Sequence, residues 1–356
     1  MNNSAIKEKI ESANTALGIE LGSTRIKAVL VTDDCQVVAS GDFVWENELH
    51  DNIWTYPLEK VWKGIQTSYA NLAASVSEEY GLKLTRIGSI GISAMMHGYM
   101  PFDKDGNLLV PFRTWRNNIT GEAAEKLTKL FNFNIPERWS VAHLYQAILN
   151  KEDHVKDIDF ITTLDGYVSW KLSGNKNTGI GDASGMFPID EATKNYDGKM
   201  LEQFASLPEV AQYPWNIREI LPDVLLAGQP AGKLTEEGAK LLDISGQLQA
   251  GSLIAPSEGD AGTGMVATNA VRKRTGNISA GTSAFSMVVL DQKLNKVHRD
   301  IDMVTTPDGA PVAMVHTNNC SSDINAWASV FNQFAKALGV NLSPNQLYEK
   351  LFDTSL

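Results

Sequence analysis

The alternation of apolar and polar positions predicts three short strands near the start of the chain. Apolar runs cover residues 15–21, 26–31 and 35–39, and polar or glycine-containing segments separate them. Gly22-Ser23-Thr24 gives a bend signal in the first connection, and the polar residues 32–34 give a turn signal in the second. We therefore expect a β-meander whose first connection is a tight bend.

The following segment predicts a long helix and then a buried strand. Between residues 58 and 76, apolar side chains recur at helical spacing and form one apolar face. Pro57 suits the first turn of such a helix. Residues 87–93 form an apolar run that ends at Met95-Met96-His97-Gly98, which indicates a strand leading into a loop.

Farther along the chain, a strand, a Gly-Ser/Thr bend and a second strand occur again. Residues 276–279 and 286–290 are predicted strands around Gly281-Thr282-Ser283, and this echoes the unit near residue 22. A hairpin turn is predicted at residues 103–107, before a strand at 108–111. Helical patterns cover four more segments, namely 121–131, 141–150, 165–172 and 325–338.

Composition narrows the class of protein. The chain has 356 residues, which is enough for two domains, and we place a boundary near Ala255. Its formal net charge is -11 and no Lys/Arg run interrupts that acidity, which argues against nucleic acid or an anionic membrane as partner. Cys35 and Cys320 are far apart, and no signal peptide or membrane span is visible, so we expect a cytoplasmic protein.

Five segments, in order, resemble motifs of the FGGY family of carbohydrate kinases. Residues 17–27 (LGIELGSTRIK) resemble the opening phosphate loop of that family, and Met96-His97-Gly98 resembles its sugar-contact motif, most like the xylulokinase branch. Asp182-Ala183-Ser184-Gly185 resembles a motif of the first domain. Residues 259–262 (GDAG) resemble the catalytic aspartate segment, and residues 279–283 (SAGTS) the second phosphate loop. The resemblance covers nearly the whole chain from about Ala16 onward.

The resemblance implies an α/β fold of the actin-like, ribonuclease-H-like ATPase type, with two domains around a cleft. Residues 1–255 would be the N-terminal sugar-binding domain, and residues 256–356 the first part of the C-terminal ATP-binding domain. Family members continue past the position of Leu356 through another glycine-rich loop, so we expect the second domain to be incomplete. ATP and Mg²⁺ are the implied cofactors, a small sugar is the implied partner, and a homodimer is one option.

Two positions depart from the family pattern. The usual aspartate of the opening loop is Glu20 here. After Trp115, xylulokinases usually carry Asn-Asp, whereas this chain carries Arg116 and Asn117. An amide thus replaces the carboxylate and a guanidinium is added, which leaves the identity of the sugar open.

Asp260 is the predicted general base. Phosphoryl transfer needs positioned groups and charge neutralisation, and a carboxylate beside the acceptor hydroxyl can take its proton. Local sequence alone also allows a turn or helix-cap aspartate at this position.

The resemblance also implies binding residues, each with an ordinary structural alternative. Phosphate binding would use two sets of residues, Gly22, Ser23, Thr24 and Lys27 in the first loop and Gly281, Thr282 and Ser283 in the second. Sugar binding would use Met96, His97, Trp115, Arg116, Asn117 and Asp260. Glu20 would hold Mg²⁺ through water. The alternatives are hairpin turns, a structural histidine, a core tryptophan, a surface loop and a solvated charge. Asp165 and Asp182 read as structural or capping residues.

We therefore expect an ATP-dependent kinase of a ketopentose, with D-xylulose and L-ribulose as first candidates. The absence of a Gly-x-x-x-x-Gly-Lys-Ser/Thr segment disfavours a P-loop enzyme. Two alternatives stay open at this point. One is an actin-like ATPase or chaperone-type protein, since fold alone does not separate it from a kinase. The other is a catalytically silent sugar-binding fragment.

Overall fold

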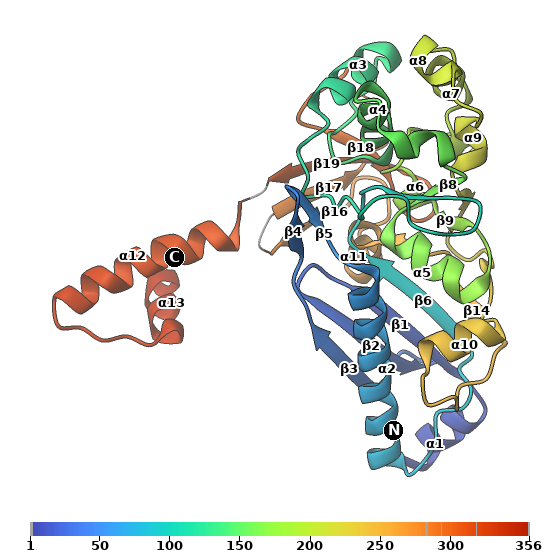
Figure 1. The fold of residues 1–356 in the computed structure, drawn as a ribbon. Coiled ribbons are helices and arrows are strands. Elements are labelled where there is room, and N and C mark those ends of the chain that lie inside the picture. The colour runs from blue at the N-terminus through green and yellow to red at the C-terminus, as the bar shows by residue number, and fades with distance from the viewer. Residues whose placement is uncertain (1–2, 282–283, 293, 318, 355–356) are drawn as a thin grey trace.

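The predicted β-meander is confirmed in the computed structural model, which describes residues 3–281, 284–292, 294–317 and 319–354. Strands β1 (Thr15–Leu21), β2 (Arg25–Thr32) and β3 (Val37–Val44) pair antiparallel in chain order. Alternate residues of β1 and β2 are buried, as expected for strands with one covered face. The long helix α2 (Leu58–Tyr80) covers that face with the apolar stripe predicted for it (Figure 1).

The first sheet grows on the other side of β1 by parallel pairing. Strand β6 (Ser89–Ala94) lies parallel to β1, and both β14 (Leu253–Ile254) and β15 (Glu258–Gly259) lie parallel to β6. Strand β13 (Gly232–Lys233) pairs with β14 and completes the sheet. Residues 258–259, beyond the predicted domain boundary near Ala255, still pair with this sheet. The boundary itself stays a prediction.

The register of this sheet decides where the site can form. Ala94 is the partner of Leu21 on one side and of Gly259 on the other. The carboxyl ends of β1, β6 and β15 therefore lie in one row. The residues that follow these ends include the first Gly-Ser-Thr bend, Met96 and Asp260.

A second apolar core lies between a bundle of helices and a smaller sheet. The helices gather at the upper end of Figure 1 and are α3 (Gly121–Phe131), α4 (Ser140–Leu149), α7 (Gly198–Ala205), α8 (Pro208–Ala211) and α9 (Ile217–Ile220). The sheet is antiparallel, and its four strands follow the order β16 (Gly276–Ala280), β17 (Ala284–Val289), β19 (Pro311–Thr317) and β18 (Asp302–Thr305). Met287, Val312 and Met314 are buried on its inner side. The strands predicted around Gly281 are thus confirmed.

The other elements are mostly short and connect or cover these two cores. They are α1 (Asn3–Glu11), β4 (Glu48–His50), β5 (Ile53–Thr55), β7 (Met100–Phe102), η1 (Asp153–Asp157), β8 (Phe160–Thr162), α5 (Leu164–Ser173), β9 (Asn177–Gly179), α6 (Ile180–Ala183), β10 (Ile189–Asp190), β11 (Asn195–Tyr196), β12 (Asp223–Leu225), α10 (Glu236–Leu242) and α11 (Asp260–Ala267).

One predicted strand is wrong. The turn at residues 103–107 forms as expected, since the Asp103 carboxylate accepts hydrogen bonds from the backbone N–H groups of Asp105 and Asn107. Residues 108–111, however, form only an isolated bridge between Leu108 and Phe102. Strand β7 pairs instead with β8, far away in the sequence. Strand β7 thus has a distant partner along one edge and only a short local pairing on the other.

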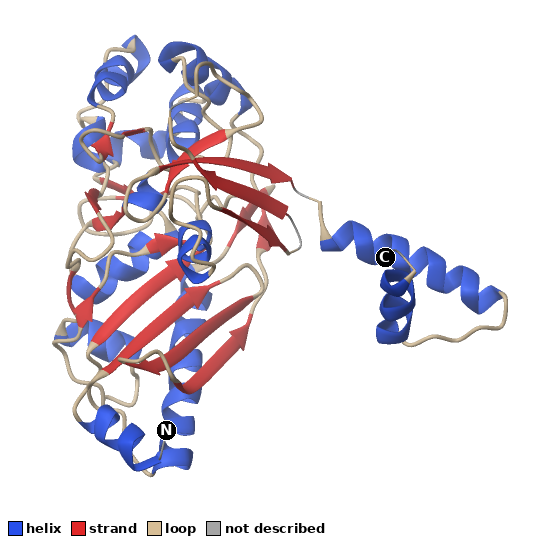
Figure 2. Cartoon of the chain, turned by 180° about the vertical axis from the view of Figure 1, so that it is seen from behind, coloured by secondary structure: helices blue, strands red, loops and turns tan. Residues whose placement is uncertain are grey.

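The last two described helices project from the body as an arm (Figures 1 and 2). They are α12 (Ser321–Ala337) and α13 (Pro344–Asp353), and the former confirms the helix predicted at 325–338. Trp327 and Phe334 of α12 are 64% and 67% exposed. None of the helices within the described ranges has the length and apolar character needed to cross a membrane.

Candidate active site

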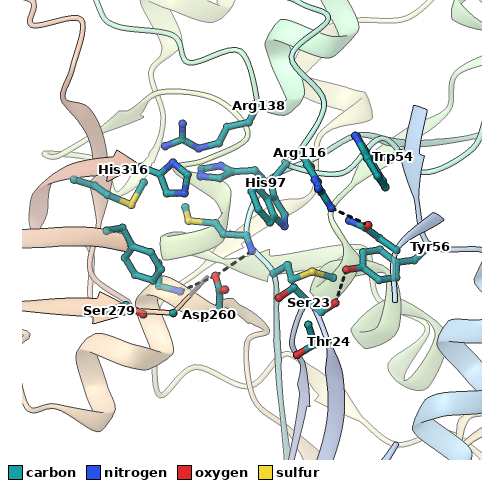
Figure 3. Close-up of a pocket in the computed structure, with 18 of the residues that line it drawn as sticks. Ser23, Thr24, Trp54, Tyr56, His97, Arg116, Arg138, Asp260, Ser279 and His316 are labelled. Carbon is teal, nitrogen blue, oxygen red and sulfur yellow. Dashed lines mark hydrogen bonds between the residues drawn. The ribbon is translucent and has the colours of Figure 1, made fainter. Parts of the chain in front are cut away.

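A cavity of about 800 Å³ opens where the ends of β1, β6 and β15 face the small sheet (Figure 3). Ser23 and Thr24 of the first bend line it, and so do Ser279 and Gly281 of the second. The two repeated hairpins therefore end at the same cavity. Its volume lies within the range of about 300–1,000 Å³ that is usual for small-molecule sites.

Asp260 lies in the wall of this cavity at the first residue of α11. Its Oδ1 accepts hydrogen bonds from the backbone N–H groups of Met96, at 3.2 Å, and Ala261, at 2.9 Å. Burial raises the pKa of the Asp260 carboxyl to about 6, although these two donors oppose the rise. The negative charges of Glu20 and Asp165 raise it further. The group is thus ionised near neutral pH, but it is a stronger base than an ordinary aspartate.

His97 lies beside Asp260 in a strained backbone conformation, with φ at 72°. Its side chain is 5% exposed, and Nδ1 lies 3.3 Å from the backbone oxygen of Gly185. Burial and the nearby Arg138 charge hold the pKa of His97 well below its usual range, so the ring is neutral. Since a carbonyl can only accept, Nδ1 carries the proton, and Nε2 is the acceptor of this ring.

Aromatic residues hold the first bend and one wall of the cavity. Tyr56 donates its hydroxyl to the backbone oxygen of Ser23 at 2.8 Å, and the Trp45 indole donates to Gly22 at 2.7 Å. The two rings lie 4.2 Å apart. These contacts fix a glycine-containing bend that would otherwise sample several conformations.

Arg116 lies over an aromatic ring at the other side of the cavity. Its guanidinium carbon is 3.9 Å from the centre of the Trp54 ring, and it also donates to the Asn47 amide oxygen at 3.2 Å. Trp115 lines the cavity as well, with its ring edge-on to His316 at 6.2 Å. Two predicted sugar contacts, Trp115 and Arg116, therefore lie where a ligand can reach them.

Asn117 lies elsewhere. It is 2% exposed, and its side-chain amide exchanges hydrogen bonds of 2.8 Å with the backbone N–H and oxygen of Trp54. The neighbouring Asn118 lines the cavity instead. Asn117 is therefore outside the cavity lining, and its amide group holds Trp54.

The remaining predicted residues divide into three groups. Gly22 and Lys27 are outside the cavity lining, and Lys27 lies 3.5 Å from Glu20 across the β1–β2 pair. Thr282 and Ser283 lie outside the described residues. Glu20 is half exposed at the end of β1 and adds negative charge at Asp260.

Glu20 is compatible with a nucleotide-bound Mg²⁺. The residues that the structure describes contain no cluster of three or more acidic, histidine or cysteine side chains suited to a metal. Mg²⁺ that accompanies phosphates usually takes only one or two carboxylates and keeps several waters. A single half-exposed carboxylate beside the cavity fits that requirement.

Several lining residues escaped the sequence analysis. Arg138, Phe285, Met314 and His316 complete the side of the cavity nearest the small sheet. Arg138 forms an ion pair with the buried carboxylate of Asp302 in β18, so its guanidinium is held in place. None of these residues belongs to a recognisable motif. They reach the cavity through strand pairing and packing that link distant segments.

The expected actin-like ATPase fold is confirmed, because the chain superposes on solved sugar kinases with TM-scores up to 0.74. The family model for the N-terminal domain of the FGGY family of carbohydrate kinases matches residues 15–249, and that for the C-terminal domain matches residues 276–353. The chain belongs to the FGGY family of carbohydrate kinases.

Known relatives agree in fold and differ in the substrate that they are named for. The chain is 21% identical to a xylulose kinase from Staphylococcus xylosus over 249 residues, or 65% of this chain and 47% of the relative. A xylulose kinase and a gluconate kinase, both from Lactobacillus acidophilus, superpose with a TM-score of 0.73 each. Their identities are 16% and 17%, and each superposition covers 88% of this chain and, respectively, 62% and 61% of theirs. The chain spans about half the length of the curated relatives it matches.

Proposed function

We propose that this protein transfers the terminal phosphoryl group of ATP to a hydroxyl group of a small sugar. D-xylulose and L-ribulose are the first substrates to test. The observation that carries the proposal is the place of Asp260, a carboxylate of raised pKa in a cavity lined by both hairpin bends. Membership of the FGGY family supports the same reaction class.

Asp260 acts as the general base in the proposed reaction. Both backbone hydrogen bonds go to Oδ1, which leaves Oδ2 to take the proton of the attacking hydroxyl. As that oxygen bonds to the γ-phosphorus, the bond to the bridging oxygen breaks and ADP leaves. Mg²⁺ bound with ATP supplies charge neutralisation, and Glu20 is the residue that would hold it.

Other lining residues orient the two substrates. His97 Nε2 accepts a hydrogen bond from a sugar hydroxyl, Arg116 and Asn118 donate to sugar oxygens, and Trp115 packs against the apolar face of the sugar. Ser23, Ser279 and Gly281 offer hydroxyl and backbone N–H groups to phosphate oxygens. Thr282 and Ser283 stay predicted members of the second phosphate loop.

Sugar-dependent release of ADP from Mg-ATP tests this function. The panel should contain ketopentoses, hexoses, polyols and sugar acids, since the relatives differ in the substrate they are named for. One sugar is expected to raise ADP release well above the rate without sugar. Rapid ATP hydrolysis that no sugar changes would instead favour an actin-like ATPase. Sugar binding without turnover would identify a silent sugar-binding chain.

The pH dependence of the reaction follows from the base. Asp260 accepts a proton only when ionised, and its pKa is raised to about 6. We expect kcat/KM to rise about tenfold per pH unit below that value and to level off above it. Steady-state rates between pH 5 and 8 measure this profile. A flat profile over that range would exclude a base of this pKa.

The space beside His97 gives a second prediction. A Cβ atom at Gly185 would lie 2.5 Å from His97 Nδ1 and 2.7 Å from Met96 Cε, so Gly185→Ala must displace both side chains. We expect sugar affinity to fall by about tenfold or more, as one lost hydrogen bond to a neutral group suggests. Gly91→Ala is the matched control, because a Cβ at Gly91 meets no atom within 4 Å. Equal affinities in titration calorimetry would show that His97 does not contact the sugar.

A further inference from the structure

Three buried carboxyl groups lie together just behind Asp260. Asp165 and Asp182 are fully buried, and Glu258 is 6% exposed. Within the described part of the chain, none of the three forms an ion pair with a lysine or arginine. Buried carboxylates without a cation are costly, so this arrangement needs a compensating function or compensating hydrogen bonds.

The first two groups meet at one hydroxyl group. The single hydroxyl of Thr163 lies 2.7 Å from Asp165 Oδ1 and 2.5 Å from Asp182 Oδ2. One hydroxyl has one proton to donate, so a proton on one of the two carboxyl groups lets both contacts be hydrogen bonds. Burial and the charge of Asp165 raise the pKa of Asp182 well above its usual range, which agrees.

Glu258 makes a different contact, to backbone rather than to side chains. Its Oε1 accepts the N–H of Gly181 at 3.2 Å, and its Oε2 accepts the N–H of Asp182 at 3.0 Å. A Cβ at Gly179 or at Gly181 would lie 2.3 Å from one of these oxygens. Two glycines therefore make the room that this carboxyl group occupies, and its two oxygens close a clamp on the start of α6. Burial raises the pKa of Glu258 to about 8, although the two N–H donors oppose the rise.

The clamp joins the two segments that carry the site. Glu258 is two residues before Asp260, and its partner segment continues to Gly185, whose backbone oxygen holds His97. Met96, next to His97, donates its N–H to Asp260. A closed circuit of contacts thus runs from Glu258 through residues 181–185 and 96–97 to Asp260.

We propose that Glu258 is a positioning residue, whose carboxyl group fixes residues 181–185 against the Asp260 segment and so sets the geometry of Asp260 and His97 toward the sugar. This role rests on the proposed kinase function. Glu258 itself lies outside the cavity lining, so it would act through other residues.

Glu258→Gln is the sharpest test, because it keeps the size of the side chain. An amide nitrogen cannot accept a hydrogen bond, so only one of the two backbone N–H groups keeps its partner. We expect kcat to fall by up to about 100-fold with a smaller change in KM, since misplacement by an ångström has that effect.

Asp243→Asn is the matched control. Asp243 is also a buried carboxylate that accepts backbone N–H groups, those of Ser245, Gln247 and Leu248, but it lies outside the cavity lining. If Glu258 only supports the fold, both variants will lower the unfolding temperature and leave kcat per folded molecule unchanged. That result would overturn the proposal.

Backbone hydrogen exchange separates this proposal from the kinase assignment. It needs no substrate, so it applies even if no sugar is phosphorylated and the proposed function fails. In Glu258→Gln we expect faster exchange at residues 181–186 and also at residues 95–98, with neither change in Asp243→Asn. Faster exchange confined to 181–186, with 95–98 unchanged, would show that the clamp does not position the site and would overturn the proposal.

Discussion

Replacing Asp260 by asparagine is expected to lower kcat by roughly 10³-fold while the sugar still binds. The amide oxygen can still accept the N–H groups of Met96 and Ala261, so the segment keeps its place. The variant lacks the carboxylate oxygen that takes the proton. Sugar-dependent ADP release and titration calorimetry together measure the two effects.

The same substitution is expected to make the protein more stable at neutral pH. Asp260 has a pKa of 3.8 in the unfolded chain and of about 6 in the folded protein. The folded state therefore loses stability as the pH rises from 3.8 to about 6. Asparagine has no charge to bury. The difference in unfolding free energy between the variant and the wild type should therefore grow between these two pH values and stay constant above them. A variant that gains stability and loses turnover shows that the wild-type residue serves function at the expense of folding.

Asp197→Asn is the control for the capping alternative. Asp197 caps α7 by accepting the N–H of Met200 at 3.0 Å, and it is remote from the cavity lining. If Asp260 only capped the start of a helix, Asp260→Asn and Asp197→Asn would have the same effect on turnover. Full turnover in Asp260→Asn would exclude it as the base.

Arg138→Ala is expected to cost about 3–5 kcal/mol of unfolding free energy near pH 8. It removes the guanidinium that pairs with Asp302, a carboxylate only 6% exposed, and leaves that charge with the Asn134 amide. Burial already raises the pKa of Asp302 with Arg138 present. Without Arg138 the pKa rises further, so the group takes up a proton as pH falls and the cost shrinks toward pH 5. Urea unfolding at the two pH values measures the difference.

Arg299→Ala is the control, because it removes an ion pair that is exposed to water. Arg299 pairs with Glu125, and both side chains are about half exposed. An exposed pair of this kind adds little to stability, because water and salt screen it. Equal losses in the two variants, or a loss in Arg138→Ala that does not change with pH, would contradict a buried pair at the cavity wall.

Much of the fold could be predicted from the sequence, because the patterns that indicate strands and helices are local. Alternation in residues 15–31 and helical spacing in 58–76 require only neighbouring positions, and both elements formed as expected. The strand predicted at 108–111 is reduced to one bridge, and β7 pairs fully with β8, a partner that no local pattern identifies. Asp260 and His97 could be proposed from short motifs, and the sheet register places both beside the cavity.

Residues outside motifs could not be found in this way. Arg138 and His316 reach the cavity only through helix packing and the pairing of β19. Asn117 and Asn118 differ by one position in an irregular loop, where no period tells which side chain faces inward. In the structure, Asn117 is buried and Asn118 lines the cavity.

The pairing of β6 has a consequence for the order of events during synthesis. Residues 89–94 are synthesised before β14 and β15, so one edge of β6 lacks these partners while residues 95–252 are made. An open strand edge invites pairing with other chains, and closing so long a loop is slow. Because Asp260 follows β15, the segments of the meander and the long helix are synthesised before the site can be complete. Substrate therefore cannot protect the chain from aggregation until this late strand docks.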